Sequence, residues 1–204
     1  NFNVPNGKTV SPHKLGEAAS EVGYPVALKM ISPRLLHKTE AGAVVLDLKD
    51  EEELKLAVEK MKIDVTAYDA DAASELFLVE AMSPNPVAEL IINLRQDPQF
   101  GAALVLGSGG VLVELMADTA TLLLPTSPAD IIRALKSLRV RRLLEGFRGR
   151  PAVDIPKVAE EIYKLCIAYQ NHGKTITEIE INPLFVYRDT VSAIDALIQV
   201  PVDT

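Results

Sequence analysis

The stretch of this sequence that most constrains its fold lies near the C-terminal end, where polar and apolar side chains alternate. Because successive side chains of a strand point to opposite faces of a sheet, Glu178, Glu180 and Asn182 are expected on one face and the intervening isoleucines on the other. We predict strands over residues 176–181 and 191–198, joined as a hairpin. Burying an unpaired charge costs several kcal/mol, so each carboxylate must be paired, bound to a metal or directed into a cleft.

The turn of this hairpin predicts its register. If residues 188–189 form a two-residue turn, Tyr187 pairs with Thr190, and counting back places Asn182 directly opposite Asp195. Directly opposed residues share a face, with Cβ atoms roughly 5 Å apart. On the return strand, alternation gives Asp195 the same face as Val191, Ala193 and Leu197. The turn sequence Arg-Asp is not the Asn-Gly that such turns favour, and a shift of one residue would separate Asn182 from Asp195.

The two opposed residues form a candidate magnesium site. Mg²⁺ prefers hard oxygen ligands and usually shares them with substrate phosphates. The Asp195 carboxylate beside the Asn182 amide oxygen, with Glu180 nearby, offers such ligands. The alternative is a polar hairpin that faces solvent.

The rest of the chain predicts an α+β fold with two α/β lobes. We expect a smaller lobe over residues 1–82 and a larger lobe over residues 83–204, because a proline-rich break follows Met82. Apolar stripes and caps indicate helices that start at Ser11-Pro12, Asp50 and Ser127-Pro128, and a longer helix around Val158 to Tyr169. The other expected strands are 26–31, 43–48, 76–82, 87–94, 102–106, 111–115 and 119–124, and residues 64–74 are expected to form a loop.

Three further charges interrupt apolar strands. Lys29 is a candidate contact for nucleotide phosphates, since a lysine acts on phosphate as a point charge. The alternative for Lys29 is an edge-strand lysine that guards against aggregation. Glu80 and Glu89 also lie in strands, where each is either a ligand of a small molecule or part of a surface alternation. Hinges between lobes commonly bind small ligands, so a nucleotide cleft is expected between the two lobes.

The run from Gly107 to Gly110 interrupts the strand pattern and is a candidate anion-binding loop, because glycine backbone N–H groups can face an anion. A hairpin or a bulge is the alternative, and the run matches neither a Walker A loop nor a dinucleotide fingerprint. His37 lies in a loop between two expected strands, where functional residues are common.

Composition excludes several classes of protein. The net charge of −7 and pI of about 5.1 argue against general nucleic-acid binding. Cys166 is the one cysteine and is expected in the core, so a cytoplasmic protein without disulfides is the simplest interpretation. No apolar stretch is long enough for a membrane span and no signal peptide is recognised. Because residue 1 is not Met, a fragment or a processed chain is expected.

Seven segments follow one another over nearly the whole chain: residues 23–29, 32–42, 79–82, 97–101, the glycine run through Glu114, 146–151 and 178–184. As an ordered set they resemble the β-type, ATP-grasp portion of NDP-forming acyl-CoA synthetases, the acetate–CoA ligases and their succinyl-CoA synthetase relatives. The family's short first helical segment is missing before Asn1. Its CoA-binding portion with the phosphohistidine is also missing, so the resemblance implies one subunit or one excised domain.

The resemblance implies roles for the candidate residues. Lys29 would contact ATP phosphates, and the backbone from Glu80 to Met82 would meet adenine. Asn182 and Asp195 would hold Mg²⁺. Catalysis would involve Glu180, which would steady the partner's phosphohistidine, and His37, which matches a histidine that relays phosphate in some members. The full nucleotide-binding set is Lys29, Glu80, Ala81, Met82, Glu89, Gly107, Gly109 and Gly110.

The implied function is the ATP/ADP·Mg²⁺-binding module of an acid–CoA ligase (ADP-forming), with a CoA-binding, phosphohistidine-bearing domain or subunit of the same enzyme as partner. We expect the isolated chain to bind ATP·Mg²⁺ without making acyl-CoA. One alternative is a non-catalytic, nucleotide-sensing module of a protein acetyltransferase. Another is an ATP-grasp carboxylate ligase that releases an acylphosphate. Neither nucleic acid nor a membrane is expected as a partner.

Overall fold

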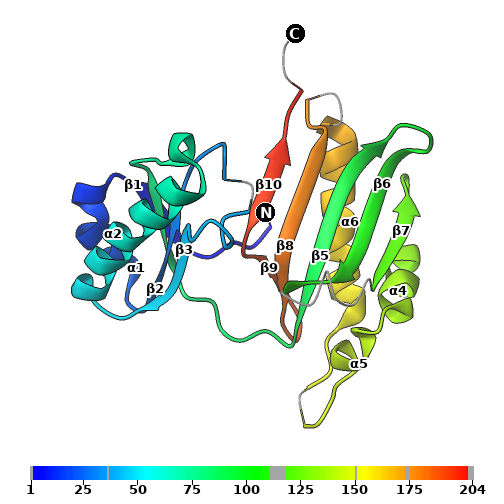
Figure 1. Cartoon of the computed structure of the whole chain (residues 1–204). Coiled ribbons are helices and arrows are strands. Elements are labelled where there is room, and N and C mark those ends of the chain that lie inside the picture. Colours follow the sequence, from blue (N-terminus) through cyan, green and yellow to red (C-terminus); the bar gives the residue numbers. More distant parts are fainter. Residues whose placement is uncertain (1, 36, 111–117, 150, 173–174, 202–204) are drawn as a thin grey trace. The chain divides into compact units, whose positions relative to one another are not determined.

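The computed structural model describes residues 2–35, 37–110, 118–149, 151–172 and 175–201 (Figure 1). The chain divides into an N-terminal unit, Pro5–Pro84, and a C-terminal unit made of Asn85–Thr204 with Asn1–Val4. The division lies two residues beyond the expected boundary after Met82.

The residues at the start of the chain belong to the C-terminal unit, although the sequence analysis assigned them to the lobe 1–82. Phe2 packs against the core of the C-terminal unit. The N–H of Ala193 donates to the carbonyl of Asn3 at 2.9 Å, and the Asn3 side chain donates to Thr190. These contacts tie residues before the first strand to the C-terminal hairpin, which lies almost 190 residues further along the chain.

The N-terminal unit is a four-stranded antiparallel sheet with the order β1-β4-β2-β3. Its elements are β1 (Gly7–Val10), a short 3-10 helix (Pro12–Lys14), α1 (Leu15–Val22), β2 (Val26–Met30), β3 (Val44–Leu48), α2 (Glu51–Tyr68), a second 3-10 helix (Ala70–Ala72) and β4 (Phe77–Ala81). Apolar residues of α1 and α2 pack on one face of this sheet and form a core with its alternate strand residues (Figure 1).

Local sequence explains the limits of α2. The Asp50 carboxylate accepts from the N–H of Glu53 at 2.9 Å, so the predicted cap is confirmed. The predicted loop over residues 64–74 is wrong, because α2 continues to Tyr68 and a 3-10 turn follows. Val65 is fully buried one helical turn after Met61, and this burial extends the helix through residues whose composition suggested a loop.

The C-terminal unit is built on a larger antiparallel sheet with the order β10-β8-β5-β6-β7, and β9 pairs with β8. Its elements are β5 (Ala88–Asp97), β6 (Gly101–Ser108), β7 (Thr119–Leu123), α4 (Pro128–Ser137), α5 (Arg141–Leu144), α6 (Ile155–His172), β8 (Glu178–Val186), β9 (Val191–Ala193) and β10 (Ala196–Gln199). The helices α4 and α6 cover one face of this sheet (Figure 1).

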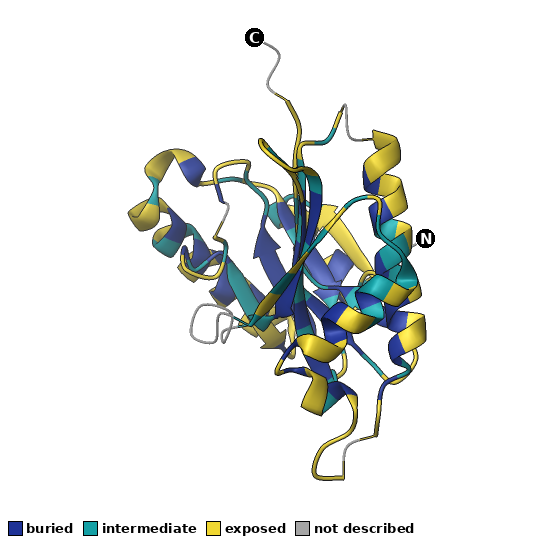
Figure 2. Cartoon of the chain, turned by 90° about the vertical axis from the view of Figure 1, so that its right-hand side faces the viewer, coloured by how far each residue is buried: buried dark blue, intermediate teal, exposed yellow. Residues whose placement is uncertain are grey.

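Burial follows these layers. Buried residues run along the strands of both sheets, while exposed residues mark the outer sides of the helices (Figure 2). The predicted α+β class is therefore confirmed, with two sheets that each carry helices on one face. In the part of the chain that the structure describes, no helix combines the length and apolarity that a membrane crossing requires.

Candidate functional site

A buried ion pair marks the sheet of the N-terminal unit. Lys29 Nζ lies 2.6 Å from Glu80 Oε2, and the two side chains are 6% and 11% exposed. Lys29 is opposite Leu78 and Glu80 is opposite Ala27 in the β2–β4 register, so the charged residues are diagonal neighbours on one face. The edge-strand alternative for Lys29 is wrong, because β2 lies between β4 and β3.

A glycine makes room for this pair. Gly7 on β1 is opposite Glu80, and a Cβ atom at Gly7 would lie 2.7 Å from Glu80 Cγ and 2.9 Å from the carbonyl of Val79. Such approaches are far inside van der Waals contact, so the Glu80 side chain occupies space that a larger residue on β1 would fill. No sequence pattern marks Gly7, since its contact with Glu80 depends on β1 pairing with β4.

The two residues after Glu80 end the strand. Ala81 N–H donates to the carbonyl of Asn6 at 2.8 Å, and Met82 N–H approaches the carbonyl of Pro25 at 3.5 Å. The Met82 sulfur accepts from the N–H of Asp47 at 3.4 Å. The segment expected to meet adenine is therefore fixed on several sides by backbone contacts.

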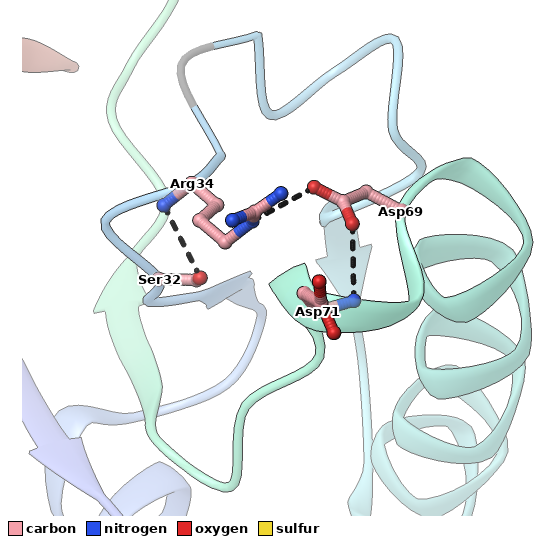
Figure 3. A network of polar contacts seen from close by, with 4 residues as sticks. All are labelled: Ser32, Arg34, Asp69 and Asp71. Atoms are coloured by element: carbon pink, nitrogen blue, oxygen red, sulfur yellow. Dashed lines mark hydrogen bonds and ion pairs between the residues drawn. The ribbon is translucent and has the colours of Figure 1, made fainter.

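His37 lies in the loop between β2 and β3. It is exposed, and its carbonyl accepts from the N–H of Ala41 at 3.2 Å. The start of the same loop is tethered by Arg34, whose Nε donates to Asp69 at 2.9 Å (Figure 3). The hydrogen bond from Arg34, together with one from the N–H of Asp71, lowers the pKa of Asp69.

In the C-terminal unit, the predicted hairpin register is confirmed. Tyr187 N–H donates to Thr190 at 2.9 Å across the turn. The pairing then continues without a shift along β8, so that Asn182 N–H donates to the carbonyl of Asp195 at 3.1 Å. Both Asn182 and Asp195 are half-buried.

The predicted alternation along the return strand is wrong in part. Val191 and Ala193 are buried in the core, whereas Asp195 is half-buried. The return strand is broken into β9 and β10, and the β5–β8 register shifts between Leu90 and Ile92. A one-residue irregularity reverses which side chains face the core, so Asp195 does not share the environment of Val191.

The glycine run packs against Glu89 and Asn182. Gly109 N–H donates to the carbonyl of Glu89 at 2.8 Å, and a Cβ atom at Gly109 would lie 2.5 Å from the Leu90 backbone. Gly110 has a φ of 72°, and its Cβ would collide with the Glu89 carboxylate. Gly110 N–H approaches Asn182 Oδ1 at 3.4 Å. The fold thus brings together three predicted site segments, while the strand expected over residues 111–115 lies outside the described residues.

Asp118 links the end of β6 to the residues just before α5. Its carboxylate accepts from the Ser108 hydroxyl at 2.7 Å and from the N–H groups of Arg139 and Val140 at 2.9 and 3.2 Å. Its own carbonyl accepts from Ser108 N–H, and a Cβ at Gly107 would lie 2.8 Å from that carbonyl oxygen. Burial acts to raise the pKa of Asp118, but these hydrogen bonds outweigh it and the pKa is lowered. No sequence pattern marked Asp118.

The hairpin brings two oxygen-bearing side chains, Asn182 and Asp195, to one register position. Among the residues that the structure describes, no group of three or more His, Cys, Asp or Glu gathers as a metal site. Asn182 and Asp195 offer an amide and a carboxylate oxygen at one register position. The remaining ligands of a Mg²⁺ ion there would come from phosphate and water. Glu180 lies two residues before Asn182 on β8, and its Oε2 accepts a hydrogen bond from Asn93 Nδ2 at 3.2 Å.

Cys166 takes no part in these sites. It is fully buried in α6, as predicted, and burial raises its pKa to about 12. A thiol with such a pKa is protonated at neutral pH, so Cys166 is not an activated nucleophile.

A family model described as an ATP-grasp domain matches residues 2–200. The β subunit of ADP-forming acetate–CoA ligase II from Pyrococcus furiosus is 35% identical over 176 residues, which are 86% of this chain and 74% of the relative. The β subunit of ligase I from the same organism is 34% identical over 178 residues, 87% of this chain and 76% of the relative.

Solved structures agree with these matches. The dinucleotide-forming acetyl-coenzyme A synthetase 1 of Ca. Korarchaeum cryptofilum, in complex with coenzyme A and Ca-AMPCP, superimposes with a TM-score of 0.90 at 32% identity, covering 98% of this chain and 87% of that chain. A protein from Pyrococcus horikoshii gives a TM-score of 0.91 at 32% identity, covering 99% and 86%.

The chain therefore belongs to the ATP-grasp family, whose fold binds nucleotides. Within that family it is a homologue of the β subunits of ADP-forming acetate–CoA ligases, and it represents the ATP-grasp module of an ADP-forming acyl-CoA synthetase.

Proposed function

We propose that this chain binds ATP or ADP with Mg²⁺ and carries out the nucleotide step of an acid–CoA ligase reaction. The observation that carries the proposal is the match of 86–87% of the chain to two β subunits of ADP-forming acetate–CoA ligases. The reaction is acid + CoA + ATP to acyl-CoA + ADP + phosphate. The phosphate passes through a histidine of a CoA-binding partner domain or subunit.

The N-terminal unit supplies a cation for the nucleotide. Lys29 is held by Glu80 as a buried point charge, and such a charge neutralises phosphate oxygens. The backbone of Glu80, Ala81 and Met82 is fixed by contacts to neighbouring chain segments. In the proposed complex, the adenine ring binds beside this backbone. Glu89 and the glycine run, with Gly107, Gly109 and Gly110, complete the proposed nucleotide contacts.

The C-terminal unit supplies oxygens for the metal. Asn182 and Asp195 would hold Mg²⁺, which would neutralise phosphate charge. The Korarchaeum homologue has been solved with Mg-AMPPCP and with its phosphohistidine segment pointing towards the nucleotide site, at 30% identity and a TM-score of 0.79. In the proposed reaction, Glu180 would steady the partner's phosphohistidine. His37 is an exposed relay candidate.

Label transfer tests the proposal. The chain is mixed with its CoA-binding partner portion and ATP·Mg²⁺ labelled in the γ-phosphate, and label on the partner's histidine is followed. We expect label on the histidine when both proteins are present, and no acyl-CoA from the isolated chain. Acyl-CoA formation by the isolated chain would refute the division of labour. Transfer that does not need this chain would refute the function.

The metal ligands have their own test in the same assay. We expect Asp195→Ala to abolish label transfer while the circular dichroism spectrum stays unchanged. Asp189→Ala is the matched control, because Asp189 is an exposed aspartate in the turn of the same hairpin. Equal transfer by the Asp195 variant and the control would exclude Asp195 as a metal ligand.

A further inference from the structure

A buried amide joins two carboxylates on the open face of the larger sheet. Asn93 on β5 is 9% exposed and is the register partner of Glu180 on β8. Its Nδ2 donates to Glu178 Oε1 at 2.6 Å and to Glu180 Oε2 at 3.2 Å. Because Asn93 alternates with the buried residues Ile92 and Leu94, it lies on the face that α4 and α6 do not cover.

The contacts fix which end of the amide faces the carboxylates. Both acceptors are carboxylate oxygens, so only the NH₂ end of Asn93 can satisfy them. The price is that Asn93 Oδ1 is buried and has no hydrogen-bond partner among the described residues. An apolar residue at position 93 would leave no polar atom unpaired. It would also suit its surroundings, because the partner of Asn93 on β6 is the partly buried Val105.

The amide restrains Glu180 in one direction. Glu178 and Glu180 are two residues apart on one face of β8, where like charges repel. A shared donor holds both carboxylates toward β5 and prevents Glu180 from turning away. The described contacts of Glu180 use Oε2, which leaves Oε1 to accept from an incoming N–H group.

We infer that Asn93 is a positioning residue for phosphoryl transfer, which it serves by orienting Glu180 toward the partner's histidine. The inference rests on the proposed function. In the step concerned, the P–N bond of the phosphohistidine breaks and a P–O bond to ADP forms. The electron pair of the P–N bond stays on the imidazole nitrogen that carried phosphorus, and the other ring nitrogen keeps its proton, so the histidine leaves as neutral imidazole. A Glu180 carboxylate in fixed orientation accepts the hydrogen bond of the imidazole N–H.

The test compares Asn93→Val with wild type in the complex with the phosphohistidine-bearing portion. We expect kcat for ATP formation from ADP to fall at least tenfold, because misplacement of a reacting group costs rate. The KM for ADP should stay unchanged. Tm is measured alongside, because Val removes the unsatisfied oxygen but also the donor of two hydrogen bonds to carboxylates. Thr121→Val on β7 is the matched control, with a polar-to-apolar change on an exposed strand position of the same sheet.

A double-mutant cycle shows whether Asn93 acts through Glu180. Asn93→Val combined with Glu180→Gln should be no slower than Glu180→Gln alone. A kcat for Asn93→Val within twofold of the wild-type value would overturn the inference. A double variant whose kcat falls by the product of the two single reductions would overturn it as well. A wild-type complex that transfers no phosphate would overturn the proposed function, and the inference with it.

Discussion

The two units place charge in opposite ways. In the N-terminal unit, Lys29 and Glu80 neutralise each other across two interior strands and are almost fully buried. In the C-terminal unit, the sheet face without helices gathers the carboxylates and amides Glu89, Asn93, Glu178, Glu180, Asn182 and Asp195, and Arg95 is the register partner of Glu178. The smaller sheet therefore presents a cation whose position is fixed, and the larger sheet presents mainly side-chain oxygens. A metal–nucleotide complex requires both kinds of group.

The largest effect is expected from breaking the ion pair. Lys29→Met leaves Glu80 buried without its partner, and removing one member of a buried pair typically costs about 3–5 kcal/mol of unfolding free energy. Urea denaturation measures this. Lys29→Met combined with Glu80→Leu should regain most of the stability but bind no nucleotide. Lys55→Ala, in an exposed pair with Glu51, is the control and should unfold like wild type. Nucleotide binding by the double variant would show that the pair serves the fold alone.

A smaller loss is expected at Asp118 in the C-terminal unit. Asp118→Asn disturbs hydrogen bonds from Ser108, Arg139 and Val140, and bonds to a charged group contribute about 2 kcal/mol. The folded-state pKa lies below the ordinary value of 3.8, so the carboxylate stabilises the fold above pH 3.8.

This contribution is lost as pH falls through the lowered pKa. The stability gap between wild type and Asp118→Asn should thus be full at pH 7 and shrink below pH 3.8. Asp189→Asn, at an exposed aspartate of the hairpin turn, is the control and should cost less. A gap that does not change with pH would contradict the assigned hydrogen bonds.

Gly110→Ala should weaken nucleotide binding with less effect on the fold. The new methyl group displaces the Glu89 carboxylate, and we expect affinity for ADP·Mg²⁺ to fall at least tenfold, about 1.4 kcal/mol. Gly101→Ala is matched, since its φ of 81° also disfavours a side chain but nothing lies within 4 Å of the added Cβ. Calorimetric affinities that fall equally in both variants would assign the effect to backbone strain.

The smallest effect is expected at the tether of the His37 loop. Arg34→Ala should leave global stability unchanged, because exposed ion pairs contribute little. The pKa of Asp69 should rise toward its ordinary value once the Arg34 hydrogen bond is removed. An NMR titration of Asp69 measures this, with Lys60→Ala as a control that removes a different exposed pair. An unchanged Asp69 pKa would mean that the tether is absent in solution.

Much of the architecture was predictable because it depends on local patterns. The caps at Asp50 and Ser127, the strands around Lys29 and Glu80, and the register that pairs Asn182 with Asp195 all follow from short-range rules. The hairpin register was predictable because a two-residue turn fixes every later pair.

The parts that were missed depend on contacts between distant residues. Sequence alternation does not reveal the break between β9 and β10, and composition suggested a loop where burial of Val65 extends α2. Asp118 and Asn93 are ordinary residues in the sequence. Their roles appear when Ser108 and Glu180, respectively, are brought beside them.

The most direct measurement is calorimetric titration of the chain with ADP, with and without Mg²⁺, repeated on Asp195→Ala. The account predicts that Mg²⁺ strengthens binding of ADP to the wild-type chain and that the substitution removes this dependence while weak metal-free binding remains. Equal Mg²⁺ dependence in wild type and Asp195→Ala would contradict the assignment of the C-terminal hairpin as the metal site.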